Sequence, residues 1–63
     1  MNKKNEMMIK KRQQLEMTQG QLADLLGVKS NTVCQYENGN RKPRGQTAIK
    51  ISKILNIPLE KII

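Results

Sequence analysis

The chain has 63 residues, enough for one small domain, and 37% of them are hydrophobic. Its 12 Lys and Arg against 5 Asp and Glu, with no His, give a formal net charge of +7 and favour a polyanionic partner. One cysteine excludes an internal disulfide and the usual zinc sites, and no apolar run approaches the roughly 20 residues that cross a bilayer. We therefore expect a single cytoplasmic domain over residues 1–63, flexible at residues 1–4, with no metal, no cofactor and no membrane contact.

Helical periodicity appears first near the N-terminus, where Met8 and Leu15, with Met7 or Ile9, predict a helix over residues 4–15. Thr18 and Gln21 have the spacing of a capping box and predict the start of a second helix. Three leucines on one face continue that helix, and Gly27, which adopts a left-handed conformation without cost, ends it. The three leucines are Leu22, Leu25 and Leu26.

The same periodicity continues through residues 30–37, where Val33 and Tyr36 predict a third helix. A break follows from Asn38 to about residue 45. A fourth amphipathic helix is then predicted from Ala48, Ile49, Ile51, Ile54 and Leu55. Pro58 suits the first turn of a last short helix through Leu59, Ile62 and Ile63. No segment alternates with period two, so the chain is predicted to be all-α, with five short helices.

Only three residues separate the second and third helices, Gln19–Leu26 and Ser30–Glu37, which is the spacing of a helix-turn-helix at about residues 19–37. Ala23 lies at the expected crossing, where a large side chain would hold the helices apart. The packing residues of the motif are expected to be Leu22, Ala23, Leu26, Gly27, Val28, Val33 and Tyr36. The outward positions of the third helix carry uncharged hydrogen-bonding groups, which suit base edges in a DNA major groove better than a solvated face.

Charge is distributed unevenly along the chain. Residues 28–53 have a net charge of +5, whereas residues 13–27 have a net charge of −2. This asymmetry favours one positive face on the folded domain, although charges scattered over a solvated surface remain an alternative.

The run Met17-Thr18-Gln19-x-x-Leu22-Ala23-x-x-Leu26-Gly27-Val28, with Tyr36-Glu37-Asn38-Gly39, resembles the Cro/repressor-type helix-turn-helix family. This family, also called the xenobiotic-response-element type, includes lambdoid phage Cro proteins and repressors. The resemblance covers about residues 8–63. It implies a compact five-helix, lambda-repressor-like DNA-binding domain. It also implies a transcriptional regulator, a repressor of phage or bacterial origin, that binds a palindromic double-stranded DNA operator as a homodimer without a small-molecule effector.

The resemblance also implies roles for individual residues. Those expected to read bases are Ser30, Asn31 and Gln35. Contacts with phosphates or the minor groove are expected from Gln19, Lys29, Asn38, Arg41, Lys42 and Arg44. Arg12 and Glu37 correspond to a structural pair that joins the first helix to the third, the alternative being two exposed charges. Lys29 stands where relatives carry Ser or Thr, and Arg44-Gly45 replaces the usual start of the fourth helix, so neither helix is expected to have a side-chain cap.

Other interpretations remain open at this stage. The same fold serves as a protein-interaction module, antitoxin-like or adaptor, whereas no nucleophile, base or metal set for an enzyme can be assembled. Cys34 is expected to face outward beside the DNA, either as a redox switch or as an inert thiol. The dimer contact is expected at residues 58–63 with the loop at residues 41–45, unless Ile62 and Ile63 simply cap the core.

Overall fold

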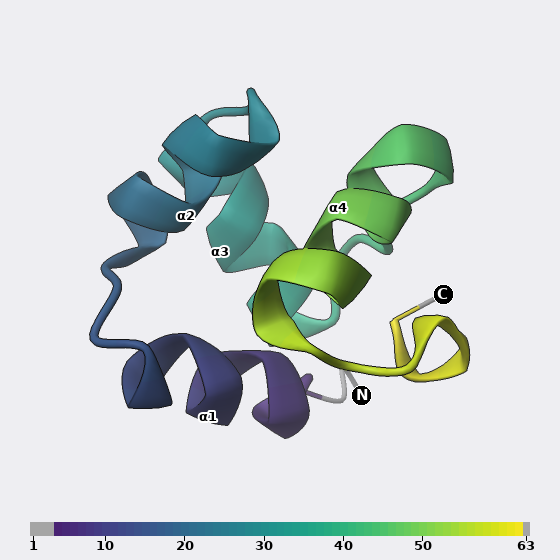
Figure 1. The fold of residues 1–63 in the computed structure, drawn as a ribbon. Helices are drawn as coiled ribbons and strands as arrows, with labels where there is room; N and C mark the ends of the chain where they lie inside the picture. The colour runs from purple at the N-terminus through teal and green to yellow at the C-terminus, as the bar shows by residue number, and fades with distance from the viewer. Residues whose placement is uncertain (1–3, 63) are drawn as a thin grey trace.

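A computed structural model describes residues 4–62 as four α-helices and one short 3₁₀ helix (Figure 1). The elements are α1 (Glu6–Gln14), α2 (Gln19–Leu26), α3 (Ser30–Asn38), α4 (Gly45–Leu55) and the 3₁₀ helix η1 (Leu59–Lys61). Residues 4–62 contain no strand, which confirms the predicted all-α class. The predicted fifth helix is a single 3₁₀ turn of three residues. We expected residues 1–4 to be flexible, but residues 1–3 lie outside the described residues, as does Ile63.

The predicted helix-turn-helix is formed by α2 and α3, which make the most extensive contact between elements. Figure 1 shows α1 along the bottom, α2 and α3 crossing one another above it, and α4 on the opposite side of the molecule. Because α4 packs against α1, α2 and η1, it closes the core from the side opposite the α2–α3 pair. This arrangement leaves one face of α3 uncovered.

The ends of α2 follow from local rules. Thr18 Oγ1 accepts from the Gln21 backbone N–H at 3.0 Å, and Gln21 Oε1 accepts from the Thr18 N–H at 2.9 Å, which confirms the capping box. Gly27 ends the helix with φ at +74°, and a Cβ added there would meet nothing within 4 Å. The backbone angle rather than crowding therefore requires glycine.

Other helix ends depart from this simple pattern in two ways: some lack a side-chain cap, and some carry a left-handed residue other than glycine. Lys29 and Arg44 precede α3 and α4 without a side-chain capping bond, as expected from the sequence. Glu16 has φ at +56° in the turn after α1, a left-handed conformation that the sequence did not predict and that costs an L-residue about 1–2 kcal/mol. The same conformation at Asn56, which ends α4, is better tolerated by an asparagine.

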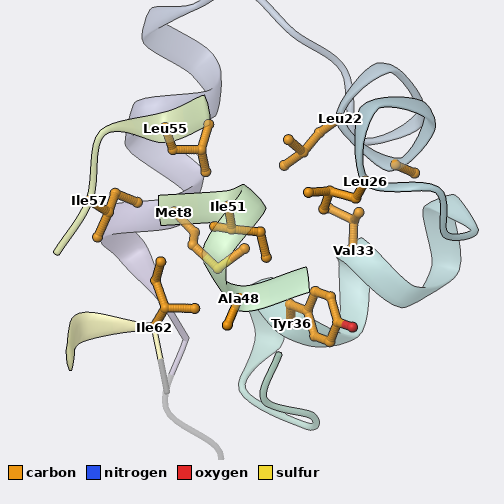
Figure 2. Packing of buried hydrophobic residues seen from close by; sticks show 11 residues of the cluster. Met8, Leu22, Leu26, Val33, Tyr36, Ala48, Ile51, Leu55, Ile57 and Ile62 are labelled. Atoms are coloured by element: carbon orange, nitrogen blue, oxygen red, sulfur yellow. The ribbon is translucent and has the colours of Figure 1, made fainter. Parts of the chain in front are cut away.

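The core is built from one cluster of aliphatic side chains contributed by all four α-helices and by residues on either side of η1, with Tyr36 as its single aromatic member (Figure 2). The expected helix-turn-helix packing residues Leu22, Ala23, Leu26, Val33 and Tyr36 are all buried, and Val28 packs partly against them. Met8 lies at the centre of Figure 2 beside Ile51. The remaining buried hydrophobic residues are Ala48, Leu55, Ile57 and Ile62.

Several predicted core positions are wrong. Leu15 is 51% exposed, because α1 already ends at Gln14 and the chain turns at Glu16. Leu25 is 56% exposed. Successive helical residues are about 100° apart, so Leu25 lies roughly 100° from the centre of the buried stripe of α2. Ile49 is also exposed, and of the alternatives Met7 and Ile9 the first is exposed and the second is half-buried.

The segment that follows η1 contributes a side chain to the core. Ile62 is only 3% exposed and packs in the hydrophobic cluster, in agreement with the alternative that it caps the core. Its side chain is therefore not available for the dimer contact expected at residues 58–63. Within that segment, Pro58, Leu59, Glu60 and Lys61 are exposed.

Candidate nucleic-acid interface

The uncovered face of α3 carries polar, uncharged side chains. Val33, Tyr36 and Glu37 are buried. A polar face that spans about 140° of arc, at about 100° per residue, is formed by Ser30, Asn31, Cys34, Gln35 and Asn38. Thr32 is half-buried and lies about 60° beyond the edge of this face. Ser30 and Asn31 are exposed and Gln35 is half-buried, so the three expected base-reading residues share one face. Hydroxyl and amide groups can both donate and accept, as base edges in the major groove require.

The only acidic residue of α3 is removed from this face by burial. Glu37 is 2% exposed, and its carboxylate accepts from Arg12 Nε at 2.6 Å and from Arg12 Nη2 at 3.3 Å. The Arg12 side chain is itself 13% exposed and donates its Nη1 to the Met17 carbonyl at 2.7 Å. The ion pair therefore joins α1 to α3, and it leaves no uncompensated negative charge behind the outward face of α3.

Gln19 belongs to the same network. This residue begins α2 and is half-buried, and its Nε2 donates to Glu37 Oε1 at 2.9 Å. The resemblance indicated a phosphate contact for Gln19 but not this bond, which joins residues 18 positions apart. The backbone adds a second link, since the Asn5 N–H donates to the Glu37 carbonyl at 2.8 Å. No local sequence signal predicts either contact, because neither partner lies within a helical turn of the other.

Three cations follow α3 in an exposed loop. Arg41, Lys42 and Arg44 are exposed around the buried Pro43. The loop is attached to α3 because the Asn40 and Arg41 N–H groups both donate to the Gln35 carbonyl, at 3.0 and 3.3 Å. The surface hollow beside the loop is lined by Tyr36, Asn40, Arg41, Lys42, Arg44 and Thr47. The predicted cationic contacts thus lie directly beyond the C-terminal end of the polar face.

A second hollow lies between the two helices of the motif, near the start of α3. It is lined by Thr18, Gly20, Gln21, Ala23, Asp24, Val28, Lys29, Ser30 and Asn31. Lys29 is exposed there, so one cation also stands before the N-terminal end of the polar face. Positive side chains therefore occur at both ends of α3.

Cys34 and Asn38 interact with each other in the middle of the polar face. Asn38 Nδ2 donates to Cys34 Sγ at 3.4 Å, and both residues are half-buried. Cys34, which we expected to face outward, is thus only partly exposed. Asn38 retains a second N–H that can donate to a phosphate.

Residues 4–62 contain no group of three or more His, Cys, Asp or Glu arranged to hold a metal ion. None of the helices in this part of the chain is long and apolar enough to cross a membrane.

Comparison with known proteins agrees with this geometry. A family model described as helix-turn-helix matches residues 8–62, nearly the whole described chain. The chain belongs to the helix-turn-helix family of Cro/C1 type. This is a family of DNA-binding transcription regulators, so the resemblance stated from the sequence is confirmed.

Individual relatives are HTH-type regulators by name. The chain is 38% identical over 52 residues to "Uncharacterized HTH-type transcriptional regulator YqaE" of Bacillus subtilis, covering 82% of this chain and 45% of that protein. It is also 36% identical over 50 residues to HTH-type transcriptional regulatory proteins of Methanococcus maripaludis strains C5 and C7, covering 79% of this chain and 15% of each relative. The chain therefore spans less than half the length of these relatives. No solved structure matches it significantly.

Proposed function

We propose that this helix-turn-helix protein is a transcription regulator, a repressor, that reads a palindromic operator in double-stranded DNA by placing α3 in the major groove. The observation that carries this proposal is the composition of the polar face of α3. Its side chains are amides, a hydroxyl and a thiol, and the helix's one acidic side chain is buried and paired with Arg12. Such a face can approach a polyanion without repulsion and offers donors and acceptors to bases.

Each residue of the face has a role that follows from its chemistry. Asn31 and Gln35 lie one turn apart, and each can bond an adenine edge with both its donor and its acceptor, whereas Ser30 can accept from or donate to any base. Arg41 and Lys42 neutralise phosphates beyond the C-terminal end of α3, and Arg44 inserts into a narrow minor groove. The remaining backbone contacts are assigned to Gln19, Lys29 and Asn38.

The size of α3 supports binding as a homodimer. Its nine residues make a helix about 13 Å long, which follows only about four base pairs. A longer site requires two copies on half-sites roughly 34 Å apart. The folded chain measures 27 × 20 × 19 Å, so two copies fit side by side on consecutive major grooves of one DNA face. Control then comes from protein concentration in the cytoplasm and requires no small-molecule effector or cofactor.

Selection from random DNA tests the proposal. Duplexes bound by the protein are enriched, sequenced and footprinted, and the number of protein chains per duplex is measured by analytical ultracentrifugation. We expect two inverted half-sites with centres about 10 base pairs apart and two chains per duplex. A single short half-site bound by one chain would refute the homodimer, and enrichment of no sequence would refute the regulator.

A protein-interaction module is the second candidate function, supported by the exposure of Leu15 and Leu25. Both leucines lie outside α3, so they leave its polar face unexplained. Competition between the selected duplex and random DNA distinguishes the two candidates. Preference for the selected duplex by a factor of about 10³ or more is expected of a specific regulator. Equal binding to both DNAs would favour the interaction module.

A further inference from the structure

The carboxylate of Glu37 determines which way the side-chain amide of Gln19 points. An ionised carboxylate only accepts hydrogen bonds, whereas an amide has one donating end and one accepting end. Gln19 must therefore present its NH₂ group to Glu37, in agreement with the 2.9 Å contact between Nε2 and Oε1. One N–H of the amide is used by this bond, and the other N–H remains for a second acceptor.

The Glu37 carboxylate is held more firmly than a surface acceptor. It is 2% exposed and binds Arg12 through both oxygens, at 2.6 and 3.3 Å. The backbone of the same residue is held as well, because its carbonyl accepts from the Asn5 N–H at 2.8 Å. Bonds to charged groups are stronger and shorter than neutral ones, so the amide of Gln19 is restrained before any DNA arrives.

The position of Gln19 gives this restraint a consequence. Gln19 is the first residue of α2, where free backbone N–H groups attract a phosphate. A phosphate offers only acceptors, so it can use the remaining N–H of Gln19 but not its carbonyl oxygen. An unrestrained amide would present either end and would lose rotamer freedom on binding.

We propose that Glu37 is a positioning residue for DNA: it orients the Gln19 amide so that its free N–H donates to one backbone phosphate. This inference rests on the proposed function, since it requires that the start of α2 meets DNA. It adds a binding role to Glu37, which never touches the nucleic acid itself. The Arg12–Glu37 pair thus links the stability of the fold to the geometry of the phosphate contact.

A scan of neutral phosphates tests the inference with the full-length chain. Methylphosphonate replaces one phosphate at a time in the selected duplex, and affinities are measured for the wild type, Gln19→Ala and Glu37→Gln. In the wild type, we expect neutralisation of one phosphate in each half-site to weaken binding about tenfold through loss of the charged hydrogen bond. Gln19→Ala should lose this sensitivity at that phosphate alone.

Glu37→Gln should lose the same sensitivity: neutralising that phosphate should weaken binding by this variant less than about threefold. The substituted amide has a single acceptor oxygen, which Arg12 would occupy, so Gln19 would lose its partner. Combining Glu37→Gln with Gln19→Ala should cause no further loss of sensitivity. Gln14→Ala removes an exposed amide from α1 and should retain the wild-type pattern at every phosphate.

Several outcomes would overturn the inference. Retained tenfold sensitivity in a folded Glu37→Gln variant would show that Glu37 does not position Gln19, while the proposed function would stand. If Gln19→Ala kept the wild-type sensitivity at every phosphate, Gln19 would not contact a phosphate and the inference would fall. If no duplex were selected at all, the proposed function itself would be refuted. If Glu37→Gln does not fold, NMR of the wild type bound to DNA decides the question. A nuclear Overhauser contact between the Gln19 side-chain NH₂ and the Glu37 CγH₂ supports the inference, and its absence overturns it.

Discussion

Removing one member of the Arg12–Glu37 pair should destabilise the fold far more than removing both. In Glu37→Leu, the side chain of Arg12, which is only 13% exposed, would keep the Met17 carbonyl as its one remaining partner. In Arg12→Met, the carboxylate of Glu37, 2% exposed, would keep only the amide of Gln19. Breaking a buried pair in this way costs about 3–5 kcal/mol.

That cost is large for a chain of this size. Proteins have about 0.05–0.15 kcal/mol of stability per residue, so 63 residues give roughly 3–9 kcal/mol. Each single variant should therefore lose about a third of the free energy of unfolding or more, and its Tm should fall by well over about 10 °C. In Arg12→Met/Glu37→Leu, no charge stays buried, and apolar replacements of buried ion pairs are often neutral or stabilising. We expect the double variant to be more stable than either single variant.

Urea and thermal unfolding followed by circular dichroism at 222 nm measure all four proteins of the cycle. Lys50→Met, which removes an exposed cation from α4, serves as a control and should change the stability by less than about 0.5 kcal/mol. Additive losses below about 1 kcal/mol for each single variant would refute the reasoning. Such losses are typical of exposed ion pairs, and the pair would then not be desolvated in solution.

Further substitutions test the interface and the helix ends. Gln35→Ala should weaken binding to the selected site by about 1–3 kcal/mol and relax the preference at one base pair; an equal loss of affinity for every sequence would contradict the assignment of α3 to the major groove. Arg44→Ala should weaken binding to all DNA and reduce the slope of log affinity against log salt by roughly one per subunit. Leu25→Ser should change the free energy of unfolding by no more than about 0.5 kcal/mol, because the side chain is exposed; a larger loss in urea titrations would mean that it packs in the core. Glu16→Gly should raise the Tm because it removes about 1–2 kcal/mol of left-handed strain, and Gly27→Ala should lower the Tm because it adds a similar strain. Shifts of the Tm in the same direction for both variants would rule out the backbone explanation.

Helix ends were largely predictable because their causes are local. The capping box of Thr18 and Gln21 and the left-handed Gly27 involve residues within one turn of one another, so the sequence carries the whole interaction. The positive φ of Glu16 could not be predicted, because glutamate has no preference for this conformation. That angle belongs to the turn that connects α1 to α2.

Burial was predictable only where the helical stripe and the tertiary contact coincide. Leu22 and Leu26 lie at the centre of the buried stripe of α2, whereas Leu25 lies beside it and has no neighbouring element to cover it. Ile62 shows the opposite case, since only the return of η1 against α4 places this terminal side chain in the core. Hydrophobicity alone does not distinguish an edge position from a central one.

The helical class, the helix-turn-helix with its glycine turn and the polar residue types of α3 can all be read from the residues in order, since periodicity and turn chemistry act over a few neighbouring positions. The pairing of the charged and amide side chains depends instead on how the helices pack. Glu37 meets Arg12 across 25 positions and Gln19 across 18. Only packing of α1, α2 and α3 brings these groups together. A buried charge requires partners from whichever elements surround it, and those neighbours exist only once the helices have packed.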